Sequence, residues 1–510
     1  GAAPKPELVA NAGFGKSFDA VKHRGWALIA VAVVCIAIGV ALWRAKPQRI
    51  DVEFGSVAVL PFLSDSPGNN YLGDGLTEAT VNGLVQLQAL RVAPRTNALR
   101  YKGSAVRPKD AGRELDVAAV VTGSVTQQDG RLRIQVDLVD VARDSQIWGA
   151  VYQGDASELV HLQTRILQDL AHALRISLSD QESRRIARQP TASADAYRAY
   201  LQGRYEWSQR SEAGLKRGIE RFQQAVVIDP QFAAAHSGLA DSYSILGYLS
   251  YLSPAETFPE ARRHATKALE LDASLAEAHA SLGFVKLYFD WDWSGAETEF
   301  QRAIALSPHL ASSHQWYSIF LLTAGRPKQA LREILLAQER EPLSLSINTD
   351  LGFHYYYTGR YADAAKQLKL VLEMGPGFPP AHLWLGRTYQ ELGQFDDAAA
   401  AFRGVDERIR DWPVSIAARG HVAGVSGRQA QAAEALGELK RLSARRFVTS
   451  YGIALVHAGL GQNDAAFASL NNAFDERSNW LVWLRLDPRW NGLRSDPRFT
   501  LLVSRMRFPL

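Results

Sequence analysis

The chain has only one cysteine, Cys35, among its 510 residues, so neither an internal disulfide nor a cysteine-based metal site can form. Long lysine or arginine runs are also absent, and a net charge of +4 is a weak excess that does not indicate nucleic-acid binding. HExxH, G-x-S-x-G and kinase glycine-loop motifs are missing. His161 and His172 have no partner at metal-ligand spacing. The sequence therefore predicts no catalytic residue, no metal site and no cofactor.

One long apolar run is present, "WALIAVAVVCIAIGVALW", from Trp26 to Trp43, and it contains no charged residue. At about 1.5 Å per residue it forms roughly 27 Å of helix, close to the thickness of a bilayer core. Tryptophans and basic residues stand at both ends, where membrane interfaces favour them. We expect a juxtamembrane linker over 1–25 and a transmembrane helix over 26–43. A buried soluble helix and a cleaved signal peptide are the alternatives.

Positive charge is slightly more abundant before this run than after it, which favours a cytoplasmic N-terminus and places the long C-terminal part on the other side. Within the linker, "ANAGFGKS" resembles the end of a phosphate-binding loop. It lacks the first glycine of that motif and a preceding strand, so we interpret it as a linker.

Residues 54–180 alternate short β-branched runs with helical patterns. "SVAVLPF" and "ALRVAPR" predict strands, "LTEATVNGLVQLQ" and "RPKDAGRELD" predict helices, and "GNNYLGDG" predicts a turn. Three further strands follow, and "QDG" joins the first two of them as a hairpin. "ASELVHLQTRILQDLAHALRISL" predicts a closing amphipathic helix. The expected fold is a small α/β domain with the order β-α-β-α-β-β-β-α.

A repeat of 34 residues dominates the rest of the chain. It is carried by five glycines, Gly325, Gly359, Gly393, Gly427 and Gly461, and by five alanines, Ala330, Ala364, Ala398, Ala432 and Ala466. This is the tetratricopeptide pattern: glycine at a left-handed turn between two helices, and small residues where those helices approach closely. Proline ends two of the units. We expect an all-α solenoid of about eight repeats over 197–480 and a polar-faced C-terminal cap over 481–510.

The stretch Asp290-Trp291-Asp292-Trp293 combines acids and aromatics in the way a sugar-binding site does. The repeat register places it instead at the turn of the third unit, which has one extra residue. We expect Asp292 or Ser294 to cap the following helix and the tryptophan rings to pack on the neighbouring turn.

By the same register, certain positions of the first helix of each unit face the concave side of the solenoid. Rigid aromatics with polar tips are favourable interface anchors, and "FHYYY" directs three of them to this side. We therefore predict a groove for a peptide or partner helix. The alternative is that these rings pack within the superhelix or on the α/β domain. The predicted groove residues are Phe284, Tyr288, Gln315, Ile319, Phe353, Tyr356, Tyr357, Arg387 and Gln390.

The α/β block carries a resemblance over its whole length. "SVAVLPF", "YLGDGLTEATVNGL", "LRVAPRTNALRYKG", "AGRELDVAAVVTGSV" and "GRLRIQVDLVDVARDSQIWGAVY" resemble the TolB N-terminal-like or FlgO-like domain. In bacteria that domain often lies between a membrane span and a tetratricopeptide array. The resemblance implies a sensing or interaction domain on the envelope side, without a known active site.

The C-terminal part, including "DWDW" and "RSNWLVWLRLDPRWNGLRSDPRF", resembles the same bacterial family, in which an output head precedes the span. The head is a DNA-binding domain in CadC-like regulators and a cyclase or kinase in related chains. No such head stands in the residues before this span, so we expect no nucleic-acid binding by this chain. The resemblance implies a single-pass inner-membrane sensor with periplasmic C-terminal domains, signalling through a protein partner or a homodimer. The alternatives are an anchored scaffold for envelope assembly, the non-catalytic part of a cyclase or kinase, and a carbohydrate binder.

Overall fold

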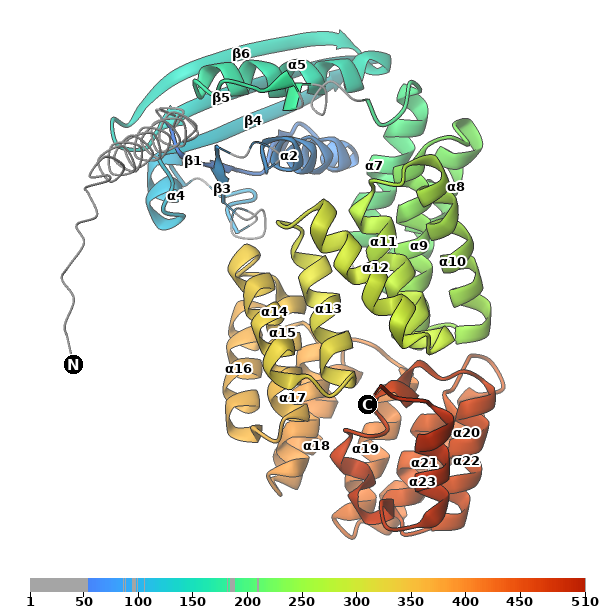
Figure 1. Cartoon of the computed structure of the whole chain (residues 1–510). Helices are drawn as coiled ribbons and strands as arrows, with labels where there is room; N and C mark the ends of the chain where they lie inside the picture. The colour runs from blue at the N-terminus through green and yellow to red at the C-terminus, as the bar shows by residue number, and fades with distance from the viewer. Residues whose placement is uncertain are drawn as a thin grey trace, which may run out of the picture. The chain divides into compact units, whose positions relative to one another are not determined.

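Figure 1 shows the computed structural model of the chain, which describes residues 54–85, 87, 89–93, 98, 100–104, 106–180, 182–183, 189–208 and 211–509. The expected linker over 1–25 and the expected transmembrane helix over 26–43 lie outside these residues. Within the described ranges, no helix combines the length and the apolar character needed to cross a membrane.

The N-terminal part is a small α/β region whose elements follow the order expected from the sequence, with a two-residue strand in addition. The elements are β1 (Ser56–Val59), β2 (Leu63–Ser64), η1 (Pro67–Asn69), α2 (Asn70–Val85), β3 (Arg91–Val92), α4 (Pro108–Glu114), β4 (Ala119–Gln128), β5 (Arg131–Asp140), β6 (Ser145–Asp155), η2 (Ala156–Glu158) and α5 (Leu159–Ala173).

The expected turn at "GNNYLGDG" is wrong, because α2 already begins at Asn70. Its glycines permit close packing instead of a turn. A Cβ atom on Gly73 would lie 2.5 Å from the carbonyl oxygen of Phe62, and one on Gly75 would lie 2.8 Å from the side chain of Leu201. Tertiary approach therefore outweighs the weak helix propensity of glycine here.

The strands form one sheet in the order β3-β1-β4-β5-β6, in which β1 pairs in parallel with β3 and β4, while β4, β5 and β6 are antiparallel. Asp129 and Gly130 form the hairpin turn between β4 and β5, both with positive φ (49° and 77°), as a two-residue type I′ turn requires. In β5, buried Leu132, Ile134 and Val136 alternate with exposed residues, so one face of the sheet forms the core under α2 and α5.

The rest of the described chain is all α-helical and begins with eight helix pairs. The pairs are α7 (Ala194–Ser208) with α8 (Glu212–Ile228), α9 (Ala233–Tyr248) with α10 (Pro254–Leu271), α11 (Ala276–Val285) with α12 (Trp293–Leu306), α13 (Ala311–Thr323) with α14 (Pro327–Arg340), α15 (Leu345–Tyr357) with α16 (Tyr361–Met374), α17 (Pro379–Glu391) with α18 (Phe395–Asp406), α19 (Pro413–Val425) with α20 (Gln429–Leu442), and α21 (Ser450–Gly459) with α22 (Asn463–Asp475). The first helix of each pair is called helix A below, and the second helix B.

The repeat pattern of the sequence corresponds to the helix pairs in physical detail. All five turn glycines have φ between 71° and 79°, the left-handed conformation that glycine adopts without steric cost. All five repeat alanines are completely buried, so the helices of a pair can approach closely. Pro342 and Pro376 follow directly after the caps of α14 and α16. The sequence therefore encodes an all-α solenoid of the tetratricopeptide type.

The third pair contains the extra residue expected from the sequence. A π-helical turn, η3 (Lys286–Asp290), extends α11 and accommodates the added residue. Trp291 then occupies the place of the turn glycine, with φ of 57°. A non-glycine residue in this conformation is strained, so surrounding contacts have to hold it there.

The C-terminal segment, residues 479–509, contains η4 (Asn479–Trp483), η5 (Pro488–Leu493) and α23 (Pro497–Arg505). Within this segment, α23 contacts α22, the second helix of the last pair. The segment also contacts helix pairs far away in the sequence: Trp293 donates its indole N–H to the carbonyl oxygen of Met506, and Arg485 donates to that of Thr323, both at 3.1 Å. It is therefore an internal packing element.

Candidate functional site

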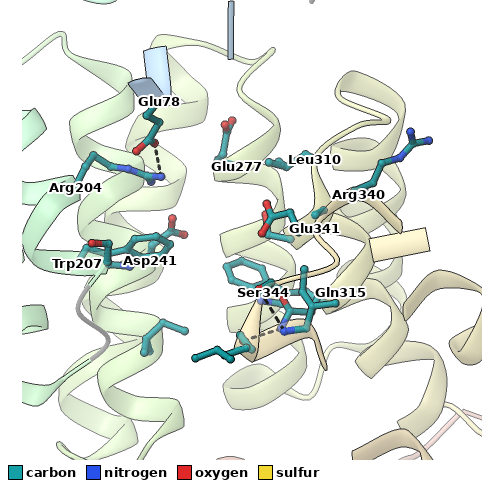
Figure 2. A pocket seen from close by; sticks show the side chains of 18 of the residues that line it. Glu78, Arg204, Trp207, Asp241, Glu277, Leu310, Gln315, Arg340, Glu341 and Ser344 are labelled. Carbon is teal, nitrogen blue, oxygen red and sulfur yellow. Dashed lines mark hydrogen bonds and ion pairs between the residues drawn. The ribbon is translucent and has the colours of Figure 1, made fainter. Parts of the chain in front are cut away.

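A cavity of about 2390 Å³ opens along the solenoid and is the candidate site. Figure 2 shows Glu78, Arg204, Trp207 and Asp241 on one side of it, and Gln315 and Ser344 on the other. Its wall is formed largely by helix A side chains and by the loops that lead from each helix B to the next helix A. The central lining residues are Asp241, Tyr248, Glu277, Phe284, Gln315, Trp316, Ile319, Asp350, Leu383, Trp384, Trp412 and Trp480.

Aromatic rings from several helix pairs form a continuous part of this wall. The ring centroids of Phe284 and Trp316 lie 5.0 Å apart, and those of Tyr248 and Trp480 lie 6.2 Å apart in a stacked arrangement. The indole N–H of Trp412 donates to the carbonyl oxygen of Leu249 at 2.8 Å, which joins the seventh pair to the second. The wall is thus rigid and largely apolar, as ligand sites in proteins are.

Asp350 is the most unusual polar residue of the cavity. It lies on α15 and is partly exposed to the cavity. Gln315 on α13 donates its side-chain N–H to the Asp350 carboxylate at 2.6 Å and to the Ser346 hydroxyl at 3.0 Å. Burial raises the pKa of Asp350 to about 7, and the hydrogen bond from Gln315 only partly opposes this shift.

A second polar group lies at the end of the cavity formed by α2 and α7. Arg204 forms an ion pair with Glu78 at 2.6 Å, and its guanidinium lies 4.7 Å from the ring centroid of Trp207. Burial would lower the pKa of Arg204, but the carboxylates of Glu78, Asp241 and Glu277 raise it above the ordinary value. Negative charge therefore predominates around this arginine.

The predicted groove residues fall into two sets, and all of them are buried. Phe284, Gln315 and Ile319 line the cavity. The remaining residues pack inside the solenoid; they are Tyr288, Phe353, Tyr356, Tyr357, Arg387 and Gln390. For the rings of the second set, the structure therefore agrees with one alternative drawn from the sequence, in which they pack within the superhelix. Binding of a partner by any of these residues stays a prediction.

The C-terminal segment covers much of the second set. The ring of Trp483 lies 4.7 Å from Phe353 and stacks on Tyr357 at 4.6 Å. Arg387 lies between two indole rings, 4.5 Å from Trp384 and 5.0 Å from Trp480. The chain itself therefore occupies the space that the repeat register assigned to a partner.

A buried ion pair anchors this segment. Asp487 and Arg489 approach to 2.6 Å, and their side chains are 0% and 1% exposed. Burial alone would raise the pKa of Asp487, but the guanidinium of Arg489 outweighs it and lowers the pKa. Tyr451 also donates to Asp487 at 2.9 Å. Sequence reasoning missed this pair because "LDPRW" was assigned to a polar-faced cap.

The Asp-Trp-Asp-Trp stretch is a turn, as expected. Asp292 caps α12 by accepting from the backbone N–H of Gly295 at 3.0 Å. The tryptophan rings do not pack on a neighbouring turn alone: Trp291 contacts Phe474 of α22 at 4.9 Å, and Trp293 contacts Phe508 at 5.1 Å. These distant contacts hold Trp291 in its left-handed conformation.

His161, considered above as a possible metal ligand, and two histidines of the A helices have ordinary structural partners. His161 contacts Gln189 at the surface, His314 hydrogen-bonds Glu333 at 2.6 Å, and His354 hydrogen-bonds the backbone carbonyl of Asp350 at 2.6 Å. In the part of the chain that the structure describes, no three His, Cys, Asp or Glu residues are grouped to hold a metal ion.

Comparison with known families and proteins agrees with this architecture. Residues 356–419 match the tetratricopeptide repeat family. The chain is 27% identical over 234 residues to a protein named putative adenylate cyclase 3 from Rhizobium meliloti, covering 44% of this chain and 39% of the relative. It is also 27% identical over 168 residues to transcriptional regulator HilA of Salmonella typhimurium, covering 33% of this chain and 30% of the regulator.

A solved structure described as Pseudomonas aeruginosa pilF is 23% identical, covers 41% of this chain and 94% of its own, and superposes with a TM-score of 0.31. The chain spans less than half the length of the two curated relatives it matches. The matches to a cyclase and to a transcriptional regulator are consistent with a signalling or protein-interaction role.

Proposed function

We propose that this chain is the membrane-anchored sensing and protein-interaction region of a bacterial signalling protein, and that its cavity binds a segment of a partner protein. The observation that carries the proposal is the cavity itself. It extends from Trp207 in the first helix pair to Trp412 at the start of the seventh, and Trp480 of the C-terminal segment forms part of its aromatic wall. Large rigid aromatics at the centre of a concave surface are typical anchors of protein interfaces.

The finer assignment is a CadC-like one-component regulator. Its support is the similarity to a named transcriptional regulator, the resemblance of the α/β region to TolB N-terminal-like or FlgO-like domains, and the apolar run over 26–43. In this assignment the chain crosses the inner membrane once, its C-terminal domains are periplasmic, and a change in partner binding or dimerisation carries the signal. An alkaline phosphatase fused to the C-terminus is expected to be active; an inactive fusion would reverse the topology.

Photo-crosslinking tests the binding site directly. A photoreactive phenylalanine analogue replaces Leu310, which lies in the cavity wall, in the full chain expressed in its own bacterium. The control replaces Leu370, which is 45% exposed on helix B of the fifth pair. We expect a discrete crosslinked protein from the Leu310 position only. Equal crosslinks from both positions, or none from Leu310, would contradict a binding cavity.

A second candidate is the non-catalytic part of an adenylate cyclase, and the similarity to a protein of that name favours it. Sequencing the coding DNA upstream of the Gly1 codon separates the candidates. A continuous reading frame encoding a helix-turn-helix supports the regulator, and one encoding a catalytic domain supports the cyclase. A start codon directly before Gly1 would favour an anchored scaffold over both.

A further inference from the structure

The cavity contains a carboxylate, Asp350, for which the described part of the chain provides no ion-pair partner. Gln315 donates one hydrogen bond to Asp350, but among the described residues no lysine, arginine or histidine forms an ion pair with it. A carboxylate withdrawn from water without such a partner is unfavourable, and the cost is removed when a ligand supplies the positive charge. Asp350 therefore has the property expected of a receptor for a cation.

The other charged residues that the structure describes in the cavity wall do not pair with Asp350. Asp241 on α9 and Glu277 on α11 add negative charge to the wall and act on Arg204, which pairs with Glu78. The further arginines of the lining do not shift the pKa of Asp350; they are Arg91, Arg100, Arg340, Arg408 and Arg410. The N-termini of the A helices also border the cavity, but their dipole acts mainly within the first turn. Asp350 is the sixth residue of α15, beyond that turn.

Aromatic rings make the same wall favourable for a cation. Phe284, Trp316 and Trp384 line the cavity, and the face of an aromatic ring attracts ammonium and guanidinium groups. The chain uses this interaction itself: the guanidinium of Arg387 lies between the rings of Trp384 and Trp480. The Trp384 ring is already in contact with Arg387, so a lysine or arginine side chain of a ligand would meet the rings of Phe284 and Trp316 together with the Asp350 carboxylate in the cavity wall.

We infer that the cavity binds a partner segment through one of its lysine or arginine side chains, whose charged group pairs with Asp350 between the aromatic rings. The inference rests on the proposed function and names the chemistry of its ligand. A protein segment is favoured over a free small cation because the cavity, at about 2390 Å³, is larger than the roughly 300–1,000 Å³ of typical small-molecule sites. Its lining also comes from the first to the seventh helix pair.

The test uses the full chain purified in detergent and a random peptide library displayed on phage. Selected peptides are synthesised in two forms, one with the basic residue and one with acetyl-lysine or citrulline in its place, and affinities are measured by fluorescence anisotropy. Asp350→Asn keeps the shape of the side chain and an acceptor for Gln315. The matched control is Asp397→Asn, an exposed aspartate on α18.

We expect the selected peptides to share a lysine or arginine, and neutralising it to weaken binding to the wild type about 10-fold or more, as loss of one charge-assisted hydrogen bond does. The same neutralisation is expected to have little effect on Asp350→Asn, and Asp397→Asn should behave as the wild type does. Circular dichroism and the thermal midpoint of Asp350→Asn should match or exceed those of the wild type, which separates lost recognition from lost folding.

Two outcomes would overturn the inference and leave the proposed function intact. In the first, peptides crosslink at Leu310 but bind without a basic residue. In the second, neutralising the basic residue weakens binding to the wild type and to Asp350→Asn equally. Absence of any selected peptide that crosslinks at Leu310 would overturn both the inference and the proposed function. Spermidine or lysine amide competing as strongly as the peptides would overturn the assignment to a protein segment.

Discussion

The A helices share one concave face, but what covers that face differs from place to place. Around Tyr357 on α15 and Arg387 on α17, the chain's own tryptophans seal the face. Around Asp241 on α9, Gln315 on α13 and Asp350 on α15 the face borders an open cavity, although Asp241 and Arg387 are both the ninth residue of their helix. One repeated helix therefore provides both a structural core and a candidate binding surface. The boundary between them is set by how far the C-terminal segment reaches.

The largest expected effect comes from removing a large side chain where the C-terminal segment covers the concave face. Trp483→Ala removes a ring that is 1% exposed and contacts Phe353 and Tyr357, so we expect a loss of about 3–5 kcal/mol in the free energy of unfolding. Urea denaturation followed by circular dichroism measures it. Leu370→Ala at the surface should cost far less, and equal losses would show that the segment is not part of the core.

Removing one partner of the buried ion pair between Asp487 and Arg489 tests the packing of the same C-terminal segment. Arg489→Leu leaves Asp487 without its cation, and we expect a loss of about 3 kcal/mol or more because a buried carboxylate becomes uncompensated. The double variant Asp487→Asn with Arg489→Leu should recover part of that loss. A double variant that is less stable than the sum of both single changes would contradict this account.

The turn glycines join helix A to helix B in five of the helix pairs. Gly359→Ala places a side chain at φ of 73°, and we expect a loss of about 1–2 kcal/mol from backbone strain. The matched control is Gly437→Ala inside α20, where the backbone is helical; there we expect a gain of up to about 1 kcal/mol. Thermal unfolding compares the two, and a neutral Gly359→Ala would argue against strain at the turn.

The last effect concerns Asp350, which borders the open cavity, and it depends on pH. The pKa of Asp350 is raised from near 4 in the unfolded chain to about 7, so wild-type stability should fall as pH rises through this interval and level off above it. Asp350→Asn should lack this decline and be more stable than the wild type above pH 7. Unfolding curves at several pH values test this, with Asp397→Asn as the control. A constant difference at every pH would exclude titration of Asp350.

Prediction from the sequence succeeded where the determinants are local. The 34-residue spacing of Gly325 and its equivalents predicted the turns, and "QDG" predicted the hairpin at Asp129 and Gly130. The helical start of α2 was missed because Gly73 and Gly75 indicate a turn unless the packing against Phe62 and Leu201 is known.

The candidate site was predicted only in part. Phe284, Gln315 and Ile319 of the predicted groove line the cavity, because a helical period alone assigns residues to a face, and their role in binding stays a prediction. It did not identify Asp350, whose raised pKa depends on tertiary burial without an ion-pair partner among the described residues. It also gave no indication that Trp483 would cover Phe353 and Tyr357.

The sequence by itself determined the α/β region, the helix pairs and the side of each helix that faces inward, because strand alternation, helical periodicity and turn glycines act over a few residues. Only the tertiary structure decided which part of the inward face is filled and which is open. That outcome depends on contacts such as Asn479 with Tyr248 and Trp480 with Ser250, which join residues about 230 positions apart. No local pattern encodes such pairings, since they arise from the accumulated curvature of the whole solenoid.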